Sequence, residues 1–228
     1  MRYRWALLAG AFALACGSIT TDLNEVIALQ VTLGPDSAGR MDFGDTLFAT
    51  AKALNGRGDS VGATIIWGDL DTLVHVDSLT GAVTARSLGT GLIQARTGSL
   101  RSNPQAVTVL PRADTVFTDS STHNPDTVTV STPDSLSDSL GVRVQNFGTA
   151  TTGLSGRTVT FSLIYPDTLS FKLTKTVTTT DPTGLAVTQV RLKQRTLPDS
   201  AVVQATVTRF NGAVVHGAPI TFVVRFVP

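Results

Sequence analysis

Cysteine and charged residues are both scarce in this sequence of 228 residues. The single cysteine, Cys16, excludes a disulfide framework or a cysteine zinc site within the chain. Charged residues make up 15% of the chain, and beyond Arg2 and Arg4 the 18 basic residues fall to 16, against 17 acidic ones. Because nucleic-acid binding requires a basic surface, we expect no nucleic-acid partner.

Catalytic and phosphate-binding patterns are missing as well. His75, Asp77 and Ser78 are the residue types of a hydrolase triad. On a strand, however, the Cα atoms of His75 and Asp77 are about 6.5 Å apart on one face, and Ser78 points to the other. The glycines of Gly89–Gly91 precede a strand pattern, whereas a phosphate-binding loop requires a helix. We therefore expect neither an enzyme nor a cofactor.

The first sixteen residues have the layout of a secretory signal. Two arginines precede an apolar run from Trp5 to Leu14, and the small residue Ala15 stands directly before Cys16. The run is too short to span a bilayer as a helix. Residues Ala13–Cys16 resemble the lipobox of bacterial lipoproteins, in which the thiol is acylated and the chain is cut just before it. The alternative is an ordinary signal peptide whose cleavage region contains a cysteine.

The lipobox resemblance implies how the protein is anchored. It predicts a cleaved signal peptide at residues 1–15 and a tether at residues 16–26, attached to the membrane through lipid on Cys16. Gly17 and Ser18 follow the cysteine. By resemblance to Gram-negative lipoproteins, the absence of Asp at the second position implies the outer membrane, so we expect a lipid-anchored protein of the cell envelope.

Apolar and polar residues alternate along most of the remaining chain, which is rich in threonine and valine. This period of two predicts strands, so the expected fold class is all-β. Seven short strands within residues 27–111 predict one β-sandwich of immunoglobulin-like size. They are Ile27–Leu33, Leu47–Ala53, Thr64–Gly68, Leu73–Asp77, Ala82–Ser87, Leu92–Thr97 and Ala106–Leu110.

A second sandwich of the same kind is predicted at residues 140–228. Pro111 ends the first pattern because proline cannot donate to a strand ladder. Residues 112–139 are rich in Ser, Thr, Asp and Pro, and form either a linker or the first strand of the second domain. Six predicted strands follow: Gly141–Asn146, Thr158–Ile164, Leu169–Leu173, Leu185–Leu192, Ala201–Phe210 and Ile220–Val227.

Each predicted sandwich carries the motifs of a known family. In the first they are Gly44-Asp45, Asn55-Gly56, Ile66-Trp67, Val76-Asp77, Thr80–Ala85 and Gly89–Ala95. With these motifs, Ile27–Leu110 resembles a group 2 bacterial Ig-like domain. Through Val159–Ser162 and Thr180–Ala186, Gly141–Val227 resembles the group 1 Ig-like repeats of invasin-type and intimin-type proteins. Neither family is defined by a catalytic residue.

Three residues of these motifs are predicted to support the fold. Trp67 is the only tryptophan after Cys16, and an indole on a central strand fills much of a core that lacks a disulfide. Gly81 stands in a predicted tight hairpin, where a positive φ is needed. Gly184 follows Asp-Pro-Thr, a typical turn sequence.

Three aspartates form a candidate calcium site. Asp69 and Asp71 lie in one loop with Asp77 a few residues on, and Ca²⁺ takes carboxylate oxygens from loops. The alternative is that they are charged turn residues, which are common in sandwiches.

A second candidate site is the tripeptide Arg57-Gly58-Asp59, which resembles the RGD sequence read by integrins. It falls in a loop between predicted strands, where it can protrude. The alternative is ordinary turn chemistry, since Gly and Asp are frequent turn residues.

These observations predict a non-catalytic cell-envelope lipoprotein that acts as a surface structural or adhesion module. The expected partners are the membrane, through the lipid anchor, and a cell-surface protein or polysaccharide. The alternative function is a carbohydrate-binding accessory module. Sugar platforms usually need exposed tryptophan or tyrosine, and after the signal only Trp67 and Tyr165 are available.

Overall fold

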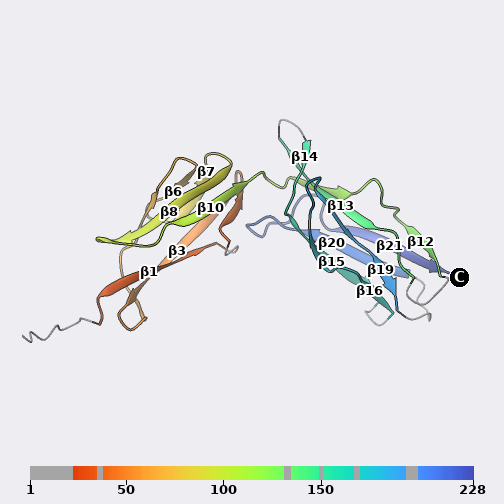
Figure 1. Cartoon of the computed structure of the whole chain (residues 1–228), viewed down its shortest axis with the longest axis horizontal. Coiled ribbons are helices and arrows are strands. Elements are labelled where there is room, and N and C mark those ends of the chain that lie inside the picture. The colour runs from red at the N-terminus through yellow and green to blue at the C-terminus, as the bar shows by residue number, and fades with distance from the viewer. Residues whose placement is uncertain (1–22, 35–37, 131–134, 149–150, 167–169, 194–199) are drawn as a thin grey trace, which may run out of the picture.

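The computed structural model describes residues 23–34, 38–130, 135–148, 151–166, 170–193 and 200–228. Cys16 and the predicted signal peptide lie outside these residues. Within the described ranges the chain forms strands, turns and loops, and no helix there is long and apolar enough to cross a membrane. The strands build two β-sandwiches that lie end to end (Figure 1). The predicted fold class, two tandem immunoglobulin-like sandwiches, is confirmed.

The first sandwich consists of two sheets of five strands each. Its strands are β1 (Val26–Leu33), β2 (Arg40–Asp42), β3 (Thr46–Asn55), β4 (Ser60–Val61), β5 (Ile66–Asp69), β6 (Val74–Val76), β7 (Ala82–Ala85), β8 (Gly89–Thr97), β9 (Leu100–Arg101) and β10 (Gln105–Leu110). One sheet has the order β1-β3-β7-β6 with β4 beside β3, and the other the order β2-β10-β8-β5 with β9 beside β8. The strand β2 runs parallel to β10 and the other pairs are antiparallel.

The core of the first sandwich comes from alternate residues of both sheets. Val74 and Val83 from one sheet and Ile93 and Val107 from the other are fully buried. Trp67 on β5 is only 6% exposed, which confirms its predicted place in the core. The burial of these apolar side chains is the main contribution to the stability of such a domain.

Gly81 is required by the turn that packs against the indole of Trp67. Its φ is +71°, and a Cβ there would lie 2.9 Å from the indole Nε1 and 2.3 Å from the carbonyl oxygen of Ala49. An L-residue would be strained in this conformation and would also clash. The prediction for Gly81 is therefore confirmed.

The second sandwich has eleven strands. They are β11 (Thr115–Thr118), β12 (Asp126–Thr129), β13 (Leu140–Phe147), β14 (Thr151–Gly153), β15 (Thr158–Tyr165), β16 (Phe171–Leu173), β17 (Val177–Thr179), β18 (Leu185–Thr188), β19 (Val190–Leu192), β20 (Ser200–Val207) and β21 (Ile220–Val227). One sheet is β11-β13-β14 with β18 beside β13, a second is β12-β21-β20-β15-β17, and β16 pairs with β19. The strand β12 runs parallel to β21.

Strict alternation is clearest on β20, where every second residue is buried. These side chains meet Phe222 and Phe226 of the neighbouring β21, and Phe226 packs on Phe171 with ring centroids 5.0 Å apart. Gly184 has a φ of +80°, and a Cβ there would lie 2.4 Å from the carbonyl oxygen of Val144, so its predicted turn role is confirmed as well.

For residues 112–139 the structure supports the strand alternative over the linker: they contain β11 and β12, which pair with β13 and β21 at the edges of the second sandwich. Two other strand predictions are corrected. The predicted strand Leu185–Leu192 is two strands, because β18 pairs with β13 whereas β19 pairs with β16. The predicted strand Ala201–Phe210 ends at Val207, and Phe210 lies in the following loop. For Leu185–Leu192 the change of pairing partner, and not the local alternation, decides where the strand ends.

Replacing the indole tests the first core. We expect Trp67→Ala to lower the free energy of unfolding by about 3–5 kcal/mol, as large-to-small changes in packed interiors do. Leu79→Ala is the matched control, since Leu79 is 78% exposed and its loss should change stability by less than about 0.5 kcal/mol. Urea unfolding followed by circular dichroism measures both. Equal effects of the two substitutions would mean that Trp67 is not a core residue.

Candidate functional site

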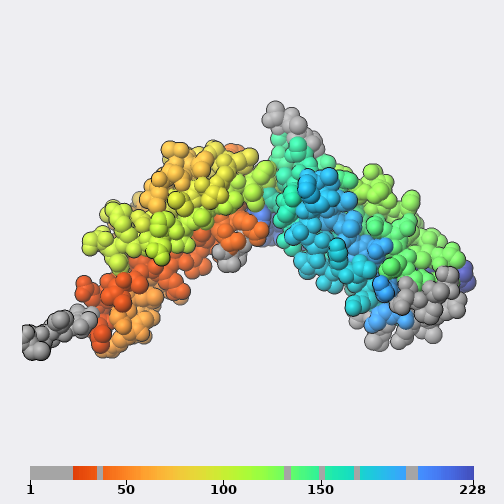
Figure 2. Space-filling view, in the orientation of Figure 1, coloured from red at the N-terminus to blue at the C-terminus, as the bar shows by residue number. Residues whose placement is uncertain are grey.

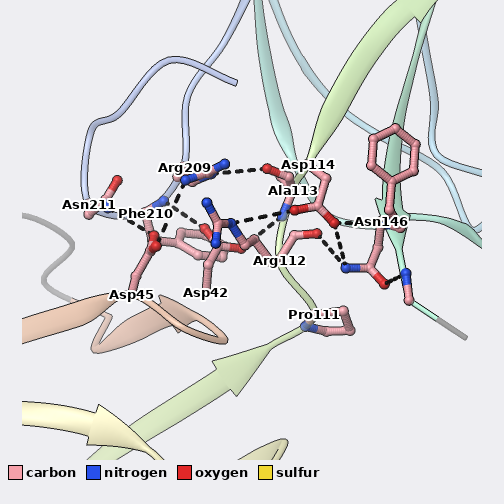
Figure 3. A network of polar contacts seen from close by, with 12 residues as sticks. Asp42, Asp45, Pro111, Arg112, Ala113, Asp114, Asn146, Arg209, Phe210 and Asn211 are labelled. Atoms are coloured by element: carbon pink, nitrogen blue, oxygen red, sulfur yellow. Dashed lines mark hydrogen bonds and ion pairs between the residues drawn. The ribbon is translucent and has the colours of Figure 1, made fainter. Parts of the chain in front are cut away.

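A cluster of polar contacts around two buried charged side chains lies where the two sandwiches meet (Figure 3). Four segments build it: Asp42–Asp45 at the end of β2, the connection Pro111–Asp114 between the sandwiches, Arg157 directly before β15, and the loop from Thr208 to Pro219 between β20 and β21. We call this cluster the junction.

An ion pair between the two sandwiches forms the centre of the junction. Asp42 ends β2 of the first sandwich and is 0% exposed, and Arg157, directly before β15 of the second, is 2% exposed. Their Oδ1 and Nη2 atoms are 2.6 Å apart. The backbone of Arg157 is itself fixed, because its N–H donates to Thr180 Oγ1 and its carbonyl accepts from the Thr180 N–H, both at 2.9 Å. A buried charge needs such a partner, so the loss of either side chain would leave the other as an uncompensated buried charge.

The carboxylate of Asp42 also accepts hydrogen bonds from two other segments. The N–H of Ala113 in the connection donates to Oδ1, and the N–H of Phe210 in the β20–β21 loop donates to Oδ2, each at 3.3 Å. One side chain of the first sandwich therefore binds three separate parts of the following chain.

Phe210 brings the β20–β21 loop onto the first sandwich. Its ring lies against two guanidinium groups, with Cζ of Arg157 4.4 Å and Cζ of Arg40 4.7 Å from the ring centroid. Cation–π contacts of this kind are strengthened by burial. The loop is shaped by Asn211, whose Oδ1 accepts from the N–H of Ala213 at 2.9 Å.

All four residues of the connection are bonded to one sandwich or the other. The carbonyl of Pro111 accepts from Arg157, and that of Arg112 accepts from Asn146 Nδ2 at 3.0 Å. The carbonyl of Ala113 accepts from Nε of Arg209 at 3.0 Å. The carboxylate of Asp114 accepts from Asn146 Nδ2 at 3.0 Å and from the N–H of Phe147 at 2.8 Å. The connection is therefore part of the packed structure and not a free linker.

Asp45 is the second carboxylate of the junction. It accepts from Nδ2 of Asn211 at 2.8 Å, and Nη1 of Arg209 lies 3.9 Å from it. Burial raises the pKa of Asp45, and the nearby charge of Asp42 raises it further, while Arg209 opposes both effects. Asp45 is thus a carboxylate whose charge is poorly compensated in the folded protein.

A shallow hollow of about 20 Å³ lies beside these groups and is lined by Arg40, Met41, Asp42, Asp45, Thr46, Leu47, Phe210 and Asn211. That volume has room for about one water molecule. Nη1 of Arg157 is buried and has no hydrogen-bond acceptor among the described residues, so a water is the chemically reasonable partner for it. The arrangement suits mechanical coupling and leaves little room for a substrate.

The aspartates of the predicted calcium site each serve a local contact. Asp69 pairs with Nδ1 of His75 at 3.3 Å and with Arg86 at 3.7 Å. Asp71 accepts from two backbone N–H groups, and Asp77 accepts from the N–H of Leu79 and from the N–H and hydroxyl of Thr80. In the part of the chain that the structure describes, no three metal-ligating side chains come together.

Hydrogen bonds to the carboxylate lower the pKa of Asp77, chiefly the bond from the N–H of Thr80. His75, which belongs to the rejected triad, is paired with Asp69 and not with Asp77 or Ser78. This group of residues therefore forms a turn and a surface ion pair.

The Arg57–Asp59 tripeptide is exposed and held in a tight turn. Oδ1 of the buried Asn55 accepts from the N–H groups of Arg57 and Asp59, both at 2.9 Å. Gly58 has a φ of +85°, and its N–H donates to the carbonyl of Asn55 at 2.9 Å. The observed geometry is that of an Asx-stabilised turn.

Reasoning from the sequence missed the residues of the junction. Asp42, Arg157 and Phe210 are far apart in the chain and match no short motif. The one available signal was the four-residue connection itself, because so short a connection forces the ends of two sandwiches into contact.

The sequence matches no family model and no curated protein. Among solved structures, it is similar to domains 4 and 5 of the S-layer protein SbsC, with 15% identity, a TM-score of 0.35 and coverage of 90% of this chain and 100% of that one. It is also similar to the Yersinia pseudotuberculosis adhesin InvE, with 15% identity, a TM-score of 0.39 and coverage of 87% of this chain and 58% of that one. A third similar structure is the D00-D0 domain of intimin, with 14% identity, a TM-score of 0.36 and coverage of 87% of this chain and 100% of that one. Likenesses at this level say nothing about activity.

Breaking the buried ion pair should strongly destabilise the junction. We expect Arg157→Met to lower the free energy of unfolding by about 3–5 kcal/mol, because Asp42 is left buried without its counter-ion. Adding Asp42→Leu should recover part of this loss, and the double-mutant cycle measures the coupling. Arg86→Met is the control: its ion pair with Asp69 is exposed and should contribute at most about 1 kcal/mol. A cycle with no coupling would contradict the proposed role of the pair.

Neutralising Asp45 should stabilise the protein near pH 7. Since its pKa is raised on folding, the folded state binds the proton more tightly, and the ionised carboxylate opposes folding at neutral pH. Asp45→Asn should therefore raise the thermal midpoint at pH 7, and the gain should disappear as the pH falls to 3.8, the ordinary pKa of an aspartate.

Asp119→Asn is the control for Asp45→Asn, and we expect it to change the thermal midpoint at pH 7 in the opposite direction. A hydrogen bond from Ser121 and the contact with Arg143 lower the pKa of Asp119, so its charge stabilises the fold above pH 3.8 and this stability is lost at lower pH. If both variants shifted the midpoint in the same direction at pH 7, our account of Asp45 would be wrong.

Proposed function

We propose that this protein is a non-catalytic, lipid-anchored structural module of the cell envelope, which holds two sandwiches in a fixed relation and presents the second one away from the membrane. The observation that carries this proposal is the buried Asp42–Arg157 pair between the sandwiches. A flexible connection would need no such pair, whereas a spacer that must keep its direction does.

The use of the buried polar groups supports a structural role. Arg157, Asp42 and the connection bind one another, and the hollow beside them has room for about one water molecule. An active site would instead direct such groups at a space large enough for a substrate.

The direction of the chain supports the presentation of the second sandwich. The chain enters the described structure at Leu23, at the end of the first sandwich remote from the junction, and its C-terminus lies at the far end of the second (Figures 1 and 2). With an acyl anchor on Cys16, the first sandwich stands nearest to the lipid and the second projects outward. An adhesive surface, if the protein has one, then belongs to the second sandwich.

The carbohydrate-binding alternative receives less support from the side chains. Trp67 is 6% exposed and is used by the core, so it offers no face to a sugar. Tyr165 is 53% exposed, and it is the one tyrosine among the described residues, as Trp67 is the one tryptophan. One phenol ring is a small platform for a saccharide.

Removing the cysteine tests the anchor. We expect Cys16→Ser to move the protein from the membrane pellet to the soluble fraction and to abolish incorporation of labelled fatty acid, because two or more acyl chains are needed for stable attachment. Ser18→Ala keeps the thiol and should remain in the membrane. A serine variant that still pelleted as the parent does would contradict the proposed anchor.

A further inference from the structure

The end of the first sandwich remote from the junction brings four segments together. The carbonyl of Leu23 accepts from the N–H of Gly56 at 3.2 Å, which joins the entry of the chain to the turn after β3. The β8–β9 hairpin turns at the same end, where Arg96 pairs with Arg101, and β9 contacts β1. We call this surface the basal end.

Basic residues gather at the basal end. Of the six basic residues described in the first sandwich, three lie on the segments that form this end and are exposed: Arg57, Arg96 and Arg101. A fourth, the exposed Lys52, lies on β3 three residues before the turn. Two acidic residues, Glu25 and Asp59, lie there too. Within the described ranges, Lys52, Arg57 and Arg96 form no ion pair. The basal end therefore has a net positive charge on a chain that is close to neutral.

The backbone keeps these cations at the surface. Arg57 lies at the tip of the turn that Asn55 stabilises through two hydrogen bonds. Leu23 and Ile27 at the same end are 43% and 59% exposed, which adds apolar surface beside the charges. Guanidinium groups beside exposed apolar side chains suit the boundary between lipid headgroups and water.

The predicted tether, residues 16–26, limits how far the basal end can lie from the lipid surface. Seven peptide steps separate Cys16 from Leu23, and they span at most about 25 Å even when fully extended. An acyl chain on Cys16 thus allows the basal end to touch the bilayer, whose surface potential acts on it only within about 8–10 Å.

We propose that the basal end is a membrane-facing surface that binds the anionic phosphates of lipid headgroups and so keeps the long axis of the protein directed away from the bilayer. This inference rests on the lipid anchor of the proposed function. The anchor alone allows the molecule to lie flat, whereas charge at one end orients it. Each basic residue near an anionic surface strengthens the contact about fivefold.

Site-specific labels in the lipidated full-length protein test the proposal. Acylated Cys16 has no free thiol, so an introduced cysteine is the one that takes a maleimide fluorophore. Ser99→Cys labels the tip of the β8–β9 hairpin, and Thr129→Cys labels β12 at the far end of the second sandwich. The probe is a vesicle of 30% phosphatidylglycerol and 70% phosphatidylcholine that carries a headgroup nitroxide quencher, compared with a vesicle of phosphatidylcholine alone.

We expect the Ser99 label to be quenched several-fold more strongly than the Thr129 label, and more strongly on the anionic vesicle. Arg57→Glu with Arg101→Glu should at least halve the quenching at Ser99 on the anionic vesicle. Arg225→Glu, which reverses an exposed charge on β21 of the second sandwich, is the matched control and should leave it unchanged. Raising the salt concentration should act as the double charge reversal does.

Two results would overturn the proposal, and they are distinguishable. Equal quenching on both vesicles, unchanged by the double reversal, would mean that the tether alone places Ser99 near the lipid, and the anchor would stand. Failure of the parent protein to float with either vesicle would remove the anchor itself, and the proposed function with it.

Discussion

The ion pair between Asp42 and Arg157 is the interaction on which the arrangement of this molecule depends. Both side chains are almost fully buried, and each belongs to a different sandwich. A shift of one sandwich against the other that broke the pair would leave a buried charge without its partner, which is costly in a medium of low dielectric constant. The pair therefore favours one relative orientation of the two sandwiches over orientations in which the two charges are apart. A hydrophobic contact of similar area would let the two surfaces slide, because it has no direction.

The other contacts of the junction follow from this pair. Asp42 orders the connection through Ala113 and the β20–β21 loop through Phe210, and Phe210 in turn covers the guanidinium of Arg157. Each group satisfies a neighbour that would otherwise be buried and unpaired. The contacts between the two sandwiches thus come from a few residues.

The class of fold was predictable from the sequence because its signals are local. Alternation identifies strands, Trp67 stands out as a lone indole, and Gly81 lies in a turn motif. Strands of two or three residues, such as β2, contain too little of the period to be recognised. The edge strands β11 and β12 lie in a polar stretch, because one face of an edge strand meets water.

The junction was not predictable for a different reason. Asp42 and Arg157 are separated by more than a hundred residues, and the pairing depends on how two finished sandwiches meet. The aspartates proposed as calcium ligands illustrate the reverse problem. The sequence spacing of Asp69, Asp71 and Asp77 predicted a shared calcium site. In the structure each carboxylate instead accepts hydrogen bonds from its own nearby donors. Local hydrogen bonds compete with any shared ligand, and spacing alone does not reveal that competition.

A distance measurement across the junction tests the central claim most directly. Spin labels at Thr50→Cys on β3 and Thr221→Cys on β21 place one probe on each sandwich, both at exposed positions. Double electron–electron resonance should give a single narrow distance distribution for the parent protein and a broad one after Arg157→Met. A parent distribution as broad as that of the variant would show that the buried pair does not fix the two sandwiches, and would contradict the account.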